Sequence, residues 1–278
     1  MRFAKIGGAR NDARGHAREE MQLINGLITR CLAASAIAWR TNPTQLSASS
    51  STDAKVAQLL DSVWVFGLLL TEEAKLYGDA GTGASMIYTS LSDANRVLAQ
   101  LKSAFPTTDL ELIPLPLGKV LMQAGILDPP SSFEAADGVQ MQLVASPEEK
   151  RAARQLREES ATPKPRPREG AAGLLQEIPV FHIGSVEHPS EGTDAFWPFF
   201  FRTADVDALW EQLGEGAPRP EITPTDLAAL VDGLRDIESA PAKPLVCAPL
   251  DGLKFVQERD RAAAASADEA RSAAPPDE

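Results

Sequence analysis

The stretch that decides the fold reads IPVF at residues 178–181 and, after a polar break, FFFRTADVDALWEQL at residues 199–213. An earlier stretch has the same order of residue types: VWVF at 63–66, a break, and IYTSLSDANRVLAQL at 87–101. A third match pairs LVASP, ending at Pro147, with LVCAP, ending at Pro249. The separation between matched residues shortens along the chain, as expected when loops change length while helices and strands are kept. The sequence therefore indicates a tandem duplication.

Each copy has the pattern of two strands followed by a helix. The first runs are apolar and rich in β-branched and aromatic residues, which is typical of a buried strand. A second strand is expected over 86–89 in one copy and 199–201 in the other. Ser92 or Thr203 then stands where a helix would begin, with an aspartate in its first turn. Apolar residues at helical spacing follow and predict a helix face that packs on the sheet.

Further elements complete each copy. Gly125 is placed to close one helix, and Pro147 is placed in the first turn of the next. Because neither copy is large enough to bury its sheet alone, we expect the two to share one core. The fold class is therefore α+β, with two pseudo-twofold related repeats, each a small sheet with packed helices. Additional strands are predicted over 110–115, where Pro114 is expected to stop the strand, and over 139–144 and 244–248. Additional helices are predicted over 117–124, 148–158, 226–235 and 249–261.

Composition limits the class of protein. The chain has 278 residues, 44% hydrophobic and 24% charged, which is typical of one or two globular domains. The formal net charge of −12 disfavours a nucleic-acid binder and tight adsorption to anionic lipid. Cys31 and Cys247 lie far apart in the chain, and we expect no disulfide between them. We find no apolar run of the ~18 residues that a membrane-spanning helix needs.

Segments of biased composition divide the chain into five parts. They are an N-terminal extension over 1–52, a first repeat over 53–160, a Pro-rich linker over 161–173, a second repeat over 174–260 and a flexible acidic tail over 261–278.

Residues 21–39, within the extension, have an apolar face at helical spacing and predict an amphipathic helix. Three interpretations stay open for it. It docks on the protein's own core, it lies peripherally on a membrane or partner surface, or it belongs to a plastid transit segment. The acidic residues before Met21 are atypical of a transit segment.

Motifs for chemistry are scarce. His182, Glu187 and His188 form one cluster with metal-ligand atoms, but a metal site needs further ligands nearby. The glycines between 78 and 83 lead into a strand, which favours a hairpin loop over a phosphate-binding loop. We find no nucleophile elbow, no His–Cys signature and no dinucleotide fingerprint. We therefore predict no catalytic, cofactor-binding or metal site, and no cofactor.

Three motifs resemble the Tic-twenty-two family, the soluble intermembrane-space component of the chloroplast inner-envelope translocon. They are IPVF at 178–181, FFFRTAD at 199–205 and IPLPLGKV at 113–120, within a resemblance that covers 55–257. The resemblance implies a pseudo-twofold α+β fold with apolar grooves, an N-terminal amphipathic helix and neither catalytic residues nor a cofactor. It also implies a location in the plastid envelope, where the family assists the passage of preproteins.

Two departures from the family stand out. Trp64 replaces an expected proline, and TPTD at 223–226 is an eroded counterpart of LPLGK at 115–119. The leading hypothesis is a non-enzymatic, chaperone-like protein that binds unfolded preproteins or translocon subunits in an apolar groove or along a strand edge. The alternative is a structural or assembly subunit of a larger plastid complex, docked through residues 21–39 and the tails. An unrecognised enzyme would need a deep polar pocket with perturbed titratable groups.

Overall fold

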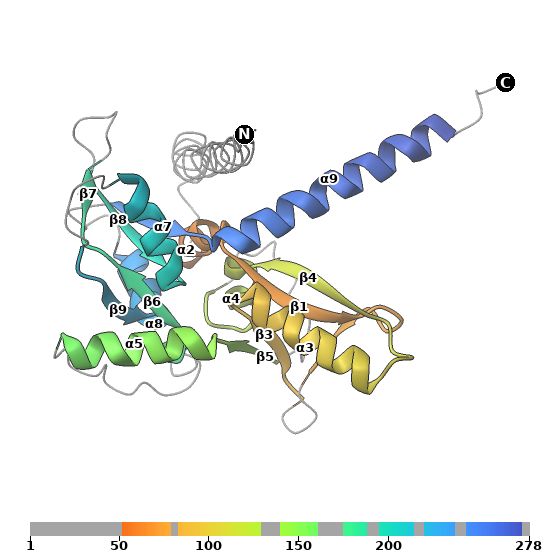
Figure 1. Ribbon diagram of the computed structural model, residues 1–278, viewed down its shortest axis with the longest axis horizontal. Helices are drawn as coiled ribbons and strands as arrows, with labels where there is room; N and C mark the ends of the chain where they lie inside the picture. The colour runs from red at the N-terminus through yellow and green to blue at the C-terminus, as the bar shows by residue number, and fades with distance from the viewer. Residues whose placement is uncertain are drawn as a thin grey trace, which may run out of the picture.

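A computed structural model describes seven parts of the chain and places them in two five-stranded sheets with helices between and outside them (Figure 1). The residues before Thr52, the linker at 161–173 and the last five residues lie outside the described parts, as do the predicted helix over 21–39 and His188. The described residues are 52–78, 83–128, 140–160, 175–187, 195–213, 220–236 and 243–273.

The first sheet is built around β1. This strand is antiparallel to β4 along its whole length on one side and to β2 and β3 on the other, and β3 continues into a parallel pairing with β5. Its strands are β1 (Trp64–Leu70), β2 (Lys75–Leu76), β3 (Ser85–Tyr88), β4 (Leu110–Pro116) and β5 (Met141–Val144).

The second sheet is paired in nearly the same way. Strand β6 is antiparallel to β9 on one side and to β8 on the other, and β8 is parallel to β10. The short β7 pairs with β8, whereas β2 pairs with β1. Its strands are β6 (Pro179–His182), β7 (Val186–Glu187), β8 (Ala195–Phe200), β9 (Thr223–Asp226) and β10 (Lys243–Cys247).

The helices form an inner and an outer set. Helices α2, α4 and α8 contribute to the core between the sheets, and α3 covers the outer face of the first sheet as α7 covers that of the second. Helix α5, from the first half of the chain, packs on β6 and β9 of the second sheet, whereas α9 crosses back onto β1 of the first (Figure 1). The two halves thus exchange their last helices. The helices are α2 (Thr52–Leu60), α3 (Leu91–Ala104), α4 (Leu117–Gln123), α5 (Pro147–Glu159), α7 (Thr203–Leu213), α8 (Leu227–Arg235) and α9 (Leu250–Ala273).

The apolar strand runs are explained by burial on both faces. Successive strand residues point to opposite sides of a sheet. Val65 of β1 therefore lies in the core between the sheets, while Phe66 faces α9 and meets Phe255 edge to face at 5.9 Å between ring centroids. In β6, Val180 likewise faces inward and Phe181 faces outward. A strand that is covered on both sides has no polar face. These runs therefore lack the alternation of apolar and polar residues that a half-exposed strand shows.

The core between the sheets joins the two halves. Val65 and Val180 are both 0% exposed in it, together with residues of α2, α4 and α8. This confirms the prediction that both halves contribute to one core. The turns leading into the inner helices also match: the Leu117 N–H donates to the Val63 carbonyl at 2.8 Å, and the Leu227 N–H donates to Ile178 at 2.9 Å.

An ion pair closes one side of this core. The Arg235 guanidinium of α8 donates from Nε to Asp53 Oδ1 at 2.7 Å and from Nη2 to Asp53 Oδ2 at 3.0 Å. The backbone N–H of Asp128 donates to the same carboxylate at 2.9 Å. The hydrogen bond from Arg235 lowers the pKa of Asp53. This two-pronged pair ties α2, near the start of the described chain, to α8 of the second half.

Prolines inside the strands correct two predictions. Pro114 does not end its strand, because β4 continues to Pro116, and Pro224 lies inside β9. Both strands lie at the edge of their sheet, where one side pairs with no strand among the described residues and proline is tolerated. Pro114 pairs with Phe66 as Pro224 pairs with Phe181. Pro224 therefore occupies the place of Pro114, and the segment judged eroded was aligned two residues off.

Several element boundaries also differ from the prediction. Ser90, not Ser92, caps α3 with its hydroxyl, whereas α7 begins at Thr203 as predicted. The helix α2 and the strand β9 were not predicted. Val144 and Cys247 take equivalent pairings, opposite Tyr88 and Phe200, so the third sequence match was also misaligned, by one residue.

Helix α9 is longer than predicted. It runs to Ala273, past the end expected at Arg261, because its alanine-rich sequence has high helix propensity. The first part of the segment predicted as a flexible tail is therefore helical.

A substitution at Gly118 tests the close approach of α2 and α4. A Cβ at this position would overlap the carbonyl oxygen of Ala57, which is backbone and has little room to move. We expect Gly118→Ala to lower the free energy of unfolding by about 2 kcal/mol or more in urea titrations. Gly233→Ala, on the exposed side of α8 with nothing within 4 Å of the new Cβ, is the control and is expected to gain about 0.5–1 kcal/mol. Equal effects of the two substitutions would contradict the helix contact.

Candidate functional site

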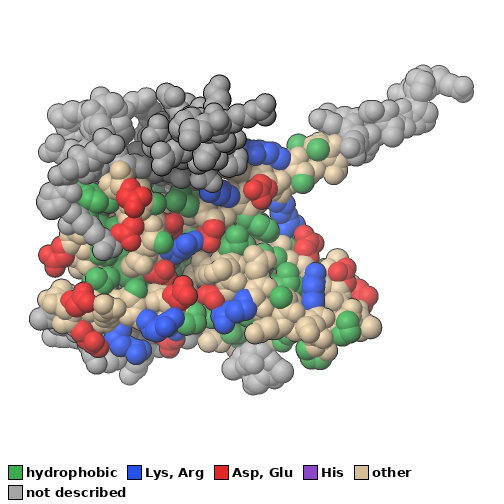
Figure 2. Space-filling model, in the orientation of Figure 1, with side chains coloured by type: hydrophobic (Ala, Val, Ile, Leu, Met, Phe, Trp, Pro, Cys, Tyr) green, Lys and Arg blue, Asp and Glu red, His purple; other side chains and the backbone are tan. Residues whose placement is uncertain are grey.

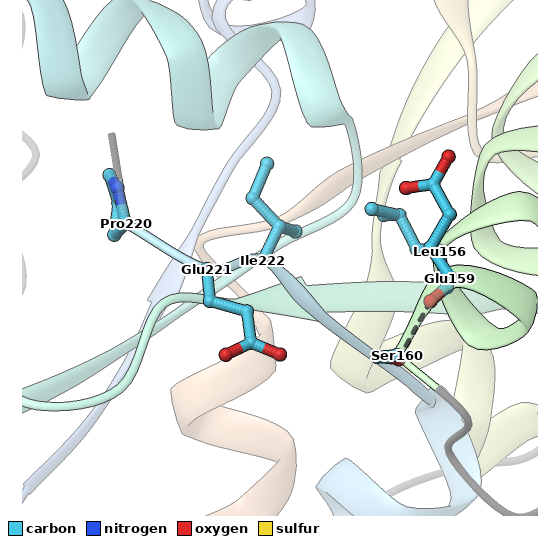
Figure 3. Close-up of a pocket in the computed structure, with 6 residues that line it drawn as sticks. All are labelled: Leu156, Glu159, Ser160, Pro220, Glu221 and Ile222. Atoms are coloured by element: carbon cyan, nitrogen blue, oxygen red, sulfur yellow. Dashed lines mark hydrogen bonds between the residues drawn. The ribbon is translucent and has the colours of Figure 1, made fainter. Parts of the chain in front are cut away.

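An open groove between α5 and β9 is the candidate binding site. Its volume is about 280 Å³ and its lining is mostly apolar. One wall is the end of α5, and the other is the chain leading into β9 (Figure 3). Ile222 is 7% exposed and packs in one cluster with Leu156, and these two side chains form the apolar floor. The lining residues are Leu156, Glu159, Ser160, Pro220, Glu221 and Ile222.

Local interactions fix both walls of the groove. The Ser160 hydroxyl donates to the Leu156 carbonyl at 2.7 Å and closes the end of α5. Arg157 donates from Nη2 to the Thr225 carbonyl of β9 at 3.3 Å and holds the helix along the strand. The groove exists because α5 crosses onto the second sheet, so residues far apart in the chain build it together.

The exchanged helices also cover the edge strands. Arg157 of α5 occupies a carbonyl of β9, and Arg259 of α9 donates to the Leu112 carbonyl of β4 at 2.9 Å. Arg259 also pairs with Glu111 at 2.8 Å. An occupied carbonyl cannot accept a hydrogen bond from an added strand without losing its arginine. At these two carbonyls an added strand would have to displace an arginine, so we take the apolar groove beside β9 as the candidate binding surface.

A second, polar pocket of about 290 Å³ lies where α3, α5 and α7 begin. Side chains cap each of these helix starts. The Ser90 hydroxyl accepts from the Asp93 N–H at 3.2 Å, and the Ser146 hydroxyl accepts from Glu148 at 3.3 Å. Glu149 of α5 reaches across to α7 and accepts from the Thr203 N–H at 3.1 Å. This last contact joins the exchanged helix to the second half.

A charged cluster borders the polar pocket. Arg202 pairs with Asp251, and its Nε lies 3.9 Å from Oδ2 of Asp205. Asp205 is 8% exposed, and this Oδ2 has no hydrogen-bond partner. Burial raises the pKa of Asp205 to about 6 and also raises the pKa of Glu149. Three carboxylates thus surround one guanidinium in a partly dehydrated place.

The polar pocket has some of the features that an active site needs. It is polar and has perturbed carboxyl groups nearby, as an enzyme would need. Its described lining includes no histidine, cysteine or lysine, and Ser90, Ser146 and Glu149 already cap helices. We interpret it as the polar junction between exchanged elements.

On the face shown in Figure 2, the described acidic and basic side chains are interspersed without a large patch of one sign.

Of the three candidate metal ligands, only His182 has a side chain within the described parts of the chain. His182 Nδ1 accepts a hydrogen bond from Trp197 Nε1 at 3.1 Å, and the two rings meet edge to face. Burial lowers the pKa of His182, so the neutral ring is favoured. Glu187 lies in β7, and the described residues include no group of three potential ligands that could hold a metal ion. His182 is therefore a packing residue of an aromatic cluster.

Sequence patterns missed the residues of the groove. Leu156 lies in the helix predicted over 148–158, and Glu221 and Ile222 precede the helix predicted over 226–235. No local signal links them, because their contact depends on the helix exchange.

The glycine-rich loop does lead into a strand as predicted: Gly78 bridges to Ser85, where β3 begins.

Comparison with known proteins identifies the fold. The structure is similar to Anabaena Tic22, described as protein transport, with a TM-score of 0.53 and 14% sequence identity over 75% of this chain and 98% of that one. It is also similar to Tic22 from Plasmodium falciparum, with a TM-score of 0.49 and 12% identity over 74% and 98%. No family model and no curated protein matches the sequence. The chain has a Tic22-like fold, as the sequence resemblance implied.

No helix in the described parts has the length and hydrophobicity to cross a membrane.

The charged cluster predicts an unusual dependence of stability on pH. The folded-state pKa of Asp205, about 6, lies above the ordinary aspartate value of 3.8, so the native state binds more protons between these pH values. Stability therefore falls as pH rises through this window. We expect Asp205→Asn to raise the free energy of unfolding by about 1–3 kcal/mol at pH 7.5, with the gain shrinking towards pH 4, in urea titrations across this range.

Asp109→Asn, at an exposed position, is the control and is expected to change stability by less than about 0.5 kcal/mol at either pH. A loss of stability in Asp205→Asn at pH 7.5 would show that the attraction to Arg202 outweighs the burial of the carboxylate.

Proposed function

We propose that this protein is a non-enzymatic, chaperone-like component that assists protein import across the plastid envelope, in the intermembrane space, by binding preproteins on an apolar surface. The single observation that carries the proposal is the groove between α5 and β9, which is mostly apolar and open to solvent. The Tic22-like fold supports it, since the Anabaena protein of this fold is described as protein transport.

The size of the groove predicts weak and transient binding. A volume of about 280 Å³ admits one or two side chains of a client. Burying one apolar side chain contributes about 1.5–3 kcal/mol, and micromolar affinity requires about 8 kcal/mol. One groove by itself therefore holds a client briefly, which suits a protein that passes a chain onward. Tighter binding would need further contacts along the client.

The repeated architecture belongs to the same proposal. We infer that the two sheets descend from a duplication and are related by a pseudo-twofold rotation. The shared strand order and the equivalent backbone bonds at Val63 and Ile178 support this. We also propose that residues 21–39 form an N-terminal amphipathic helix that makes at most peripheral contact with a membrane.

A second candidate function is a structural or assembly subunit of a larger plastid complex. The observation that favours it is α9, whose distal part extends away from both sheets (Figure 1). Residues 261–266 of this helix are exposed, so the helix presents a rod to a partner. Native fractionation separates the two candidates: a stoichiometric partner at steady state favours the subunit, and a monomer that captures unfolded clients favours the chaperone-like role.

Filling the groove tests the leading function. Ser160 is exposed at its rim, and Ser160→Trp would occupy the groove while leaving the floor intact. We expect the affinity for a fluorescently labelled, unfolded preprotein to fall at least about 5-fold in anisotropy titrations, since one buried client side chain is lost. Ser103→Trp, exposed on α3, is the matched control and is expected to bind as the unmodified chain does. Equal binding by both variants would rule the groove out as the client site.

A further inference from the structure

The chemistry of the groove between α5 and β9 defines the class of segment that fits it. We propose that the groove selects extended segments in which an apolar residue or proline is flanked by lysine or arginine, and rejects acidic segments. This inference rests on the proposed function, because it takes the groove as the client site and adds the property by which clients are chosen.

The groove combines an apolar floor with an acidic rim. Leu156 and Ile222 form the floor, with Pro220 beside them. Glu159 lies at the end of α5 and Glu221 on the chain that leads into β9, next to Ile222, and both residues line the groove (Figure 3). Both glutamates are exposed, and the described lining has no lysine or arginine. An apolar side chain in the groove would thus place its neighbours beside carboxylates.

The glutamates favour cations without burying them. Glu159 accepts a hydrogen bond from Gln155 Nε2 at 2.8 Å, which orients its carboxylate. Exposed ion pairs are individually weak, so two of them favour a basic over a neutral segment by about 2- to 30-fold in affinity. An acidic segment meets repulsion at both rims. Salt screens both effects, so the selectivity is expected to decline as ionic strength rises.

Recognition through side chains rather than backbone follows from Arg157. Its guanidinium already occupies the Thr225 carbonyl of β9, next to the groove. A client strand cannot pair at this carbonyl without displacing the arginine. The remaining determinants are the apolar floor and the rim charge, so the site chooses clients by composition and not by one fixed sequence.

The test uses the full chain and three labelled peptides of equal length with the same central apolar residues and prolines. Their flanking positions are all lysine, all glutamine or all glutamate. We expect anisotropy titrations to rank affinity as lysine, glutamine, glutamate. Glu159→Gln with Glu221→Gln is expected to reduce lysine-peptide affinity to the glutamine-peptide level, a loss of about 2- to 30-fold. Glu72→Gln with Glu73→Gln makes the same charge change in an exposed turn and is expected to leave the ranking unchanged.

Each other outcome identifies what has failed. Equal affinity for the three peptides, with binding still lost in Ser160→Trp, would overturn the charge selection and leave the client groove in place. Binding that Ser160→Trp does not change would remove the groove and the inference together. Lysine-peptide binding that emerges only after Lys164, Arg166 and Arg168 are neutralised would overturn the assignment of the groove to clients, because the chain's own basic segment would then be the occupant.

Discussion

The whole structure depends on two sheets that bury their inner faces in one shared core. Neither sheet is large enough to be stable with one face in water, and each strand run, around Val65 and Val180, is apolar on both sides. The inner helices fill the space between the sheets, and Gly118 lets α4 approach α2 closely enough to do so. The Asp53–Arg235 pair then ties the two halves together at the rim of this core.

The exchange of α5 and α9 solves the problem of the outer faces. Each sheet needs a second outer helix, and each receives it from the other half, so that Phe66 is covered by α9 and Phe181 by α5. The same crossing brings Arg157 and Arg259 to the edge strands, which protects those edges from further pairing. The apolar groove is a consequence of this arrangement, because it forms where α5 ends beside β9.

At the junction where α5 and α9 begin, burial disfavours the charged form of two carboxyl groups. Glu149 caps α7 from another half of the chain, and Asp205 keeps a carboxylate in a place where burial opposes its charge. Arg202 offsets part of this cost through Asp205 and Asp251. Such a cluster adds specificity to the docking of α5 more than it adds stability, since desolvation consumes most of the attraction. It accounts for the polar lining of the pocket.

The sequence by itself determined the secondary structure around its apolar runs and the repeated strand–strand–helix order, because residue periodicity and cap residues act over a few neighbouring positions. Its resemblance to a known family implied the Tic22-like fold. It misplaced Ser92 as a cap and misaligned Pro224, since both errors turn on hydrogen bonds and strand pairing that local patterns do not record. Only the tertiary structure decided that α5 and α9 change places and that Glu159 and Glu221 share a groove with Ile222. These features depend on contacts between residues far apart in the chain, whose free energies become visible only when both halves are packed together.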